Sequence, residues 1–155
     1  MLVAVYIPLM PVSAADALEI QGVIHRFSNS FDLKDWPGLE TCFTPDLYTD
    51  YSDLRGTPPE SMDAKQYVAL RRQALQDLKT HHQCGNHEIE GNRRQATCRT
   101  SMTIDRLEPA SQERFTTHCC YVFGLQKTRA GWKINRITQK VLWNEGNASI
   151  HSGVQ

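Results

Sequence analysis

The sequence predicts an α+β fold, because its first half repeats with the period of a helix and its second half with the period of a strand. In the first segment the apolar positions fall three and four apart, at Ile20, Val23, Ile24, Phe27 and Phe31. Further along, apolar and polar residues alternate, with one side of a strand formed by Ala96, Cys98, Met102 and Ile104. This order favours helices packed across one face of a curved antiparallel sheet. About three helices cannot fill such a sheet, so we expect a cone-shaped cavity of the kind that binds small ligands.

The N-terminal segment predicts two consecutive helices. Ser13 or Asp16 can cap the first of them. Pro37 fits the first turn of a second, short helix that carries Phe43 and that Pro45 ends.

A strand and a third helix follow. Residues 47–54 have the composition of a strand, and 55–61 that of a loop. Residues 61–79 predict an amphipathic helix, because its apolar residues share one face. They are Tyr67, Leu70, Ala74, Leu75 and Leu78.

The second half predicts four antiparallel strands, separated by three stretches with the composition of hairpin turns. These stretches are EGNR at 90–93, EPAS at 108–111 and TRAG at 128–131. The last strand opens at Trp132 and ends near Trp143. A chain of 155 residues fits one domain. We place it at 14–145, between an N-terminal extension at 1–13 and a C-terminal tail at 146–155.

Composition argues against several functions. The 17 basic and 17 acidic residues balance and are mixed along the chain, without the basic stripe of a nucleic-acid-binding protein. The sequence contains no motif for a phosphate-binding loop, a dinucleotide fold or a hydrolase serine. We therefore expect a small-molecule ligand, no nucleic acid and no cofactor.

Two features bear on location. The apolar start of the chain lacks a basic n-region, is interrupted by Pro8 and Pro11, and is shorter than the roughly 20 residues that a membrane span needs. The five cysteines contain no CxxC pair and are odd in number, which is typical of reduced thiols. We expect a cytoplasmic protein that does not bind membranes, with a secretory signal as the alternative interpretation of the apolar start.

The stretch HHQCGNH at 81–87 contains residue types that bind metals. Its adjacent histidines, His81 and His82, point to opposite faces if this stretch is a strand. They cannot then bind one ion together, so we expect no metal site.

The remaining candidates are acid–base side chains near the predicted cavity. Asp32 follows the buried Phe31 at the end of the first helix, and His82 begins the sheet. Further candidates on the strands are Tyr48, Tyr51, His118, Cys119 and Tyr121. A carboxylate in an apolar cone should have a raised pKa, and an imidazole beside it is kept charged or oriented. Such a pair can move a proton from carbon to oxygen without a cofactor.

Each candidate also has a structural interpretation. Periodicity alone leaves Asp32 open as a surface carboxylate, and a single histidine at a strand start is often structural. Tyr51 and Tyr121 can be core or rim aromatics. His118 alternates with the apolar residues of its strand, which predicts that it faces away from the cavity.

Four segments together resemble the NTF2-like superfamily, in particular its SnoaL-like and scytalone dehydratase-like branch. They are SFDLKDWPGLETCFTPD, DLYTDYSDL, THHQCGNHEIEGN and the closing hairpin from Tyr121 to Ile134. The resemblance covers residues 14 to about 145. It implies a cone of helices and curved sheet, and an acid–base elimination of water in a polyketide-derived ring.

The resemblance also implies roles for single residues. By position, Asp32 matches the acid of scytalone dehydratases and His82 their first catalytic histidine. Tyr51 matches one of two tyrosines that polarise the substrate carbonyl through water. The second tyrosine is Phe31 here, and the strand before 108–111 lacks the other histidine of the family. These departures favour a relative with a different proton-transfer reaction: an isomerisation, a cyclisation, or an elimination on another scaffold.

We therefore expect a cofactor-independent lyase or isomerase that acts on a small, largely apolar polycyclic metabolite, with Phe31, Tyr48, His118, Cys119 and Tyr121 around the substrate. We expect a homodimer or homotrimer. Two alternatives remain: a non-catalytic ligand-binding or dimerisation module, and a β-type accessory subunit of a ring-hydroxylating oxygenase.

Overall fold

The computed structural model describes residues 11–152 and 154, so most of the predicted extension at 1–13 lies outside the described residues. The helices are α1 (Ala14–Leu33), α2 (Trp36–Glu40), α3 (Ser52–Arg55) and α4 (Ala64–Leu75), with a 3₁₀ turn η1 (Ala148–Ile150). The strands are β1 (Phe43–Asp50), β2 (Glu60–Asp63), β3 (Lys79–Gly91), β4 (Gln95–Leu107), β5 (Arg114–Thr128) and β6 (Gly131–Gly146). The α+β class predicted from the two periodicities is confirmed.

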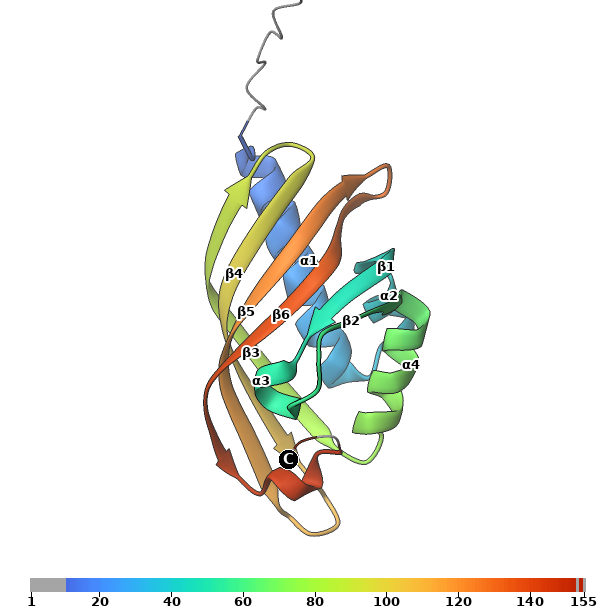
Figure 1. Ribbon diagram of the computed structural model, residues 1–155, viewed down its shortest axis with the longest axis vertical. Coiled ribbons are helices and arrows are strands. Elements are labelled where there is room, and N and C mark those ends of the chain that lie inside the picture. Colours follow the sequence, from blue (N-terminus) through green and yellow to red (C-terminus); the bar gives the residue numbers. More distant parts are fainter. Residues whose placement is uncertain (1–10, 153, 155) are drawn as a thin grey trace, which may run out of the picture.

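The six strands form one sheet in the order β2-β1-β6-β5-β4-β3. Neighbouring strands run antiparallel except β1 and β6, which are parallel. The sheet bends around α1, while α2 and α4 lie beside the short strands β1 and β2 (Figure 1). The four long strands and their three turns agree with the predicted meander.

Helix α1 has clear physical boundaries. The Ser13 hydroxyl accepts a hydrogen bond from the Asp16 backbone N–H at 3.1 Å, which caps the first turn. The helix ends where Lys34 takes the left-handed conformation, with φ +57°. Among the described residues, neither this helix nor a shorter one has the length and apolarity needed to cross a membrane.

Three predicted elements differ from the structure. Strand β1 begins at Phe43, so Phe43 belongs to the sheet and not to the short helix before it. The strand stops at Asp50, because the Asp50 carboxylate accepts hydrogen bonds from the Ser52 backbone N–H and hydroxyl and turns the chain into α3. Residues 61–63, predicted as helix, pair instead with β1, and Asp63 caps α4 by accepting a hydrogen bond from the Lys65 N–H at 2.8 Å.

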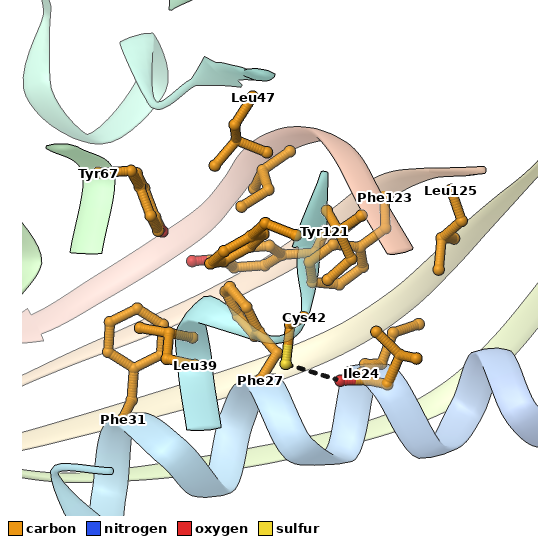
Figure 2. Packing of buried hydrophobic residues seen from close by; sticks show 14 of the residues in the cluster. Ile24, Phe27, Phe31, Leu39, Cys42, Leu47, Tyr67, Tyr121, Phe123 and Leu125 are labelled. Atoms are coloured by element: carbon orange, nitrogen blue, oxygen red, sulfur yellow. Dashed lines mark hydrogen bonds between the residues drawn. The ribbon is translucent and has the colours of Figure 1, made fainter. Parts of the chain in front are cut away.

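The main core lies between α1 and the inner face of the sheet. Phe27 of α1 packs edge-on against Tyr121 and Phe123 of β5, at ring-centre distances of 6.2 and 5.2 Å (Figure 2). The Cys42 thiol donates to the Val23 carbonyl at 3.8 Å and joins the α2–β1 connection to the same helix. Apolar side chains therefore fill this part of the interior.

Candidate active site

Asp32 and His82 form a hydrogen-bonded pair where the last turn of α1 meets the start of β3. The two Asp32 oxygens accept from the His82 ring Nδ1 at 2.6 Å, the His82 backbone N–H at 2.7 Å and the Thr80 hydroxyl at 3.0 Å. The side chains are only 6% exposed for His82 and 15% for Asp32. Because Nδ1 is committed to the carboxylate, the imidazole is oriented, and its Nε2 has no protein partner among the described residues.

The expected rise in the pKa of Asp32 is wrong. Burial does push this pKa upward, but the hydrogen bonds and charge of His82, together with the Thr80 hydroxyl, outweigh it and lower the pKa. Burial also lowers the pKa of His82, against the opposing effect of Asp32. At neutral pH the pair is therefore a carboxylate beside a neutral imidazole, and the neutral form can accept a proton.

His82 lines a cavity between the helices and the inner face of the sheet. Its wall is formed by α1, α3, α4, the inner face of the sheet and the C-terminal segment: Phe27, Phe31, Tyr51, Leu54, Arg55, Tyr67, Arg71, Leu75, Thr80, His82, Ile104, Arg106, Tyr121, Gln139 and His151. Asp32 lies behind His82 and does not reach the free space. The free volume is about 40 Å³, room for a few water molecules, so a ring-sized ligand needs wall side chains to move.

Three tyrosine hydroxyls supply polar groups to this wall. The Tyr51 and Tyr67 hydroxyls share a hydrogen bond of 2.7 Å. The Tyr121 hydroxyl accepts from the Gln139 side-chain amide at 3.2 Å. Burial raises the pKa of all three tyrosines, so they stay protonated and can donate hydrogen bonds. Tyr67 was predicted only as part of the apolar face of a helix, because the periodicity of the helix does not show where the hydroxyl of Tyr67 points.

Phe31 stacks on the catalytic candidate itself. Its ring lies 5.3 Å from the His82 ring with an interplanar angle of 26°. The ring covers one face of the imidazole and restricts its rotation, while it offers no hydroxyl to a ligand.

Sequence reasoning missed Arg106, which occupies the inner face of β4 two residues after Ile104. It is 4% exposed, and its guanidinium donates to the Thr117 hydroxyl at 2.9 Å and to the Ile104 carbonyl at 3.4 Å. Burial lowers its pKa to about 10, which leaves it charged at neutral pH. The alternation that placed Ile104 inside also places Arg106 inside, so the signal was present in the sequence.

His151 was also missed, since it lies in the predicted tail at 146–155. Strand β6 runs to Gly146, and the chain then turns through η1 and brings His151 back to the cavity, 4% exposed. Burial, and then the charges of Arg106 and Arg55, lower its pKa to about 4. Nothing in the local sequence pattern indicates this return.

Three predicted ligand-contacting residues lie outside the cavity wall. Tyr48 faces the other side of the sheet, where the Arg136 guanidinium lies 4.2 Å from its ring centre. His118 also faces that side and stacks on Trp143 at 4.3 Å, as its alternation predicted. Cys119 is buried on the inner face and receives a weak hydrogen bond from Gln139 at 3.7 Å, so it supports a wall residue. Burial raises the pKa of its thiol to about 11.

The histidines considered as metal ligands separate as expected, with His81 exposed and His82 turned inward. Another group of potential ligand atoms does come together between α1 and β3: His25, Cys84 and His87, within 4.8 Å of one another. A β-bulge after Gly85 allows Cys84 and His87 to face the same side. This group lies apart from the cavity, and its residues take no part in the wall.

The model of the SnoaL-like domain family matches residues 12–138. The chain belongs to this family. This SnoaL-like protein is 24% identical over 151 residues to the scytalone dehydratase of Colletotrichum orbiculare, a match covering 89% of the chain and 79% of that relative.

Two further proteins are similar to the chain. A scytalone dehydratase-like protein of Passalora fulva is 31% identical over 55 residues, which is 36% of the chain and 34% of that relative. For that relative, the match therefore spans about a third of its length. The crystal structure of a Kribbella flavida protein superposes with a TM-score of 0.84 at 23% identity, covering 88% of the chain and 96% of that protein, which supports the fold alone.

Proposed function

We propose that this SnoaL-like protein is a cofactor-independent lyase or isomerase that transfers a proton within a small ring-containing ketone, such as a polyketide or terpenoid intermediate. The observation that carries the proposal is the pair of Asp32 and His82. Nδ1 is fixed on the carboxylate at 2.6 Å, and the neutral imidazole lines the cavity. Similarity to scytalone dehydratases supports a reaction of the elimination type.

The proposed reaction begins at a carbon next to the substrate carbonyl. His82 Nε2 removes a proton from this carbon, and the electron pair moves toward the carbonyl oxygen as an enolate. Hydrogen bonds from the Tyr51 and Tyr121 hydroxyls, with the Arg106 charge, stabilise that oxygen. In an elimination, the enolate then forms a carbon–carbon double bond as a hydroxyl leaves the next carbon. The leaving oxygen takes the proton from His82 and departs as water.

Asp32 acts in this scheme as a positioning residue. Its carboxylate holds the tautomer that leaves Nε2 unprotonated, and it stabilises the imidazolium that forms during the transfer. A purely ligand-binding module does not require an oriented, neutral histidine on its cavity wall, so this geometry favours the enzyme over the binding alternative.

The test compares two adjacent histidines. His82→Ala should lower kcat by about 10²- to 10⁴-fold, the usual contribution of one acid–base group. His81→Ala should have no such effect, since His81 is exposed on the opposite side of β3. The measurement is NMR of a panel of cyclic β-hydroxyketones in D₂O, following both loss of water and deuterium uptake beside the carbonyl. Turnover by His82→Ala at the wild-type rate would contradict the proposal.

A further inference from the structure

Three arginines converge on the cavity wall from three different elements. Arg55 ends α3, Arg71 lies on α4 and Arg106 lies on β4. Among the described residues, no carboxylate lies within 4.0 Å of any of the three guanidinium groups. Asp32 pairs with a residue of this wall, but its oxygens are already occupied by His82 and Thr80. The cavity therefore has an excess of positive charge.

Some hydrogen-bond donors of these arginines have no partner. The Nε atoms of Arg55 and Arg71 are shielded from solvent and have no hydrogen-bond partner. A buried donor without a partner is unfavourable, so folding alone does not favour this arrangement. The Gln139 side-chain oxygen, on the same wall, is unpaired as well. Three residues of the wall therefore carry a buried polar atom without a partner.

Aromatic rings fix the two outer guanidiniums without neutralising them. The Arg55 guanidinium carbon lies 5.3 Å from the Tyr51 ring centre. The Arg71 guanidinium carbon lies 5.9 Å from the Tyr51 ring centre and 5.6 Å from that of Tyr67. A cation–π contact adds no negative charge, so both guanidiniums keep their positive charge, and their N–H groups are suited to an oxygen anion.

Three acids line hollows next to this region without pairing with its arginines. Glu60 lines a smaller hollow next to Tyr51, and Asp77 and Glu108 line an outer hollow beside Arg55 and Arg71. Glu60 and Asp77 are exposed, Glu108 is partly buried and accepts a hydrogen bond from the Ser111 hydroxyl, and none of the three makes an ion pair with these arginines. Solvent screens such carboxylates, so they do not replace a partner inside the cavity.

We propose that the ligand of this cavity carries a carboxylate, which the edges of Arg55 and Arg71 bind while Arg106 faces the oxygen that becomes negative during the reaction. This inference rests on the proposed function for the role of Arg106 and names the substrate class. Guanidinium edges bind carboxylates and phosphates alike, and we choose the carboxylate because it is the smaller group and the free space is only about 40 Å³. A largely apolar ligand would leave these donors unpaired.

The test uses binding and does not require turnover. Isothermal titration calorimetry at pH 7.5 compares benzoate with benzamide, a neutral isostere. The wild-type protein should bind benzoate at least tenfold more tightly. Arg71→Gln should remove this preference, while Arg71→Lys should keep part of it, because it keeps the charge without the bidentate edge. Arg72→Gln is the matched control, since Arg72 is the next residue on α4 and is exposed.

The outcomes separate this inference from the proposed function. His82→Ala should retain the preference for benzoate, since it alters the acid–base pair and leaves the arginines in place. Benzamide binding as tightly as benzoate, no detectable benzoate binding at millimolar concentration, or an unchanged preference in a folded Arg71→Gln variant would each overturn the carboxylate site. If instead the preference for benzoate is found but His82→Ala turns over substrate at the wild-type rate, the proposed function fails and the carboxylate site stands. Thermal unfolding of each variant shows that it is folded.

Discussion

Two neighbouring cross-strand pairs on β5 and β6 lie on the same inner face of the sheet and have opposite chemistry. Phe123 faces Ile137, and both are 0% exposed in the apolar core. One step along the ladder, Tyr121 faces Gln139, and both line the cavity. The Tyr121 and Phe123 rings stack at 5.4 Å, so the boundary between core and cavity passes between adjacent inward positions of one strand.

The two pairs separate residues that stabilise the fold from residues that form the cavity. Apolar residues on the core side gain about 25 cal/mol for each Å² of surface buried. On the cavity side, unpaired atoms of Gln139, Arg55 and Arg71 are buried at a cost. Substitutions on the two sides of this boundary should therefore act on different quantities, which the following experiments measure.

The largest effect on stability is expected on the core side. Ile137→Ala should lower the free energy of unfolding by about 2–5 kcal/mol, because it leaves a hole in a close-packed interior. Chemical denaturation gives the value, and the folded fraction should keep its affinity for benzoate. A loss below 1 kcal/mol would mean that the core side collapses around the gap and is not as rigid as its burial indicates.

Asp32→Asn should act mainly on catalysis. We expect a loss of about 10²-fold or more in kcat, since an amide cannot hold the same imidazole tautomer or stabilise its charged form. Asp32 raises the pKa of His82, so the variant should also shift the acid limb of the pH profile of kcat/KM to lower pH. That limb rises with pH in the wild type, because the neutral imidazole is the active form. An unshifted limb would show that Asp32 has only a structural role.

Acid should destabilise the cavity side through its neutral histidines. His151 has its pKa lowered to about 4 in the folded protein, against about 6.5 when exposed. The unfolded chain therefore binds a proton that the folded chain does not, and stability falls as pH drops from about 6.5 to 4, by up to about 1.4 kcal/mol per pH unit. His82 contributes in the same direction. Chemical denaturation at several pH values in this range gives the free energy of unfolding. It should fall less with decreasing pH in His151→Phe than in the wild type. An equal dependence on pH would contradict a neutral, buried His151.

Gln139→Leu should have the smallest effect on stability, within about 1 kcal/mol of the wild type. It removes a buried unpaired oxygen, but it also removes the hydrogen bond that Gln139 donates to the Tyr121 hydroxyl at 3.2 Å. Turnover should fall, because that hydroxyl loses its fixed orientation. Comparison with Ile137→Ala, two residues away on β6, tests the boundary directly: similar losses of stability in both variants would show that no such boundary exists.

Sequence reasoning reached part of the site for identifiable reasons. Asp32 and His82 were found by position and resemblance, and the structure brings them together, although the pKa of Asp32 moves opposite to the expectation. Arg106 was within reach, since it continues the alternation of β4. Arg71 could not be predicted in this way. The periodicity of α4 identifies its apolar face, but it does not show which polar side chain beside that face extends into a cavity.

The sequence by itself determined the helices and strands in which apolar residues recur regularly, because the spacing of apolar residues along the chain decides which face of an element is buried. It also determined the order of the meander, because short turns between long strands allow few other pairings. Only the tertiary structure decided which side chains meet in the cavity wall. Arg55, Arg71 and His151 come from a short helix, a helix edge and the chain after β6, and no local pattern links them. Their convergence depends on the curvature of the sheet, a property of all six strands together.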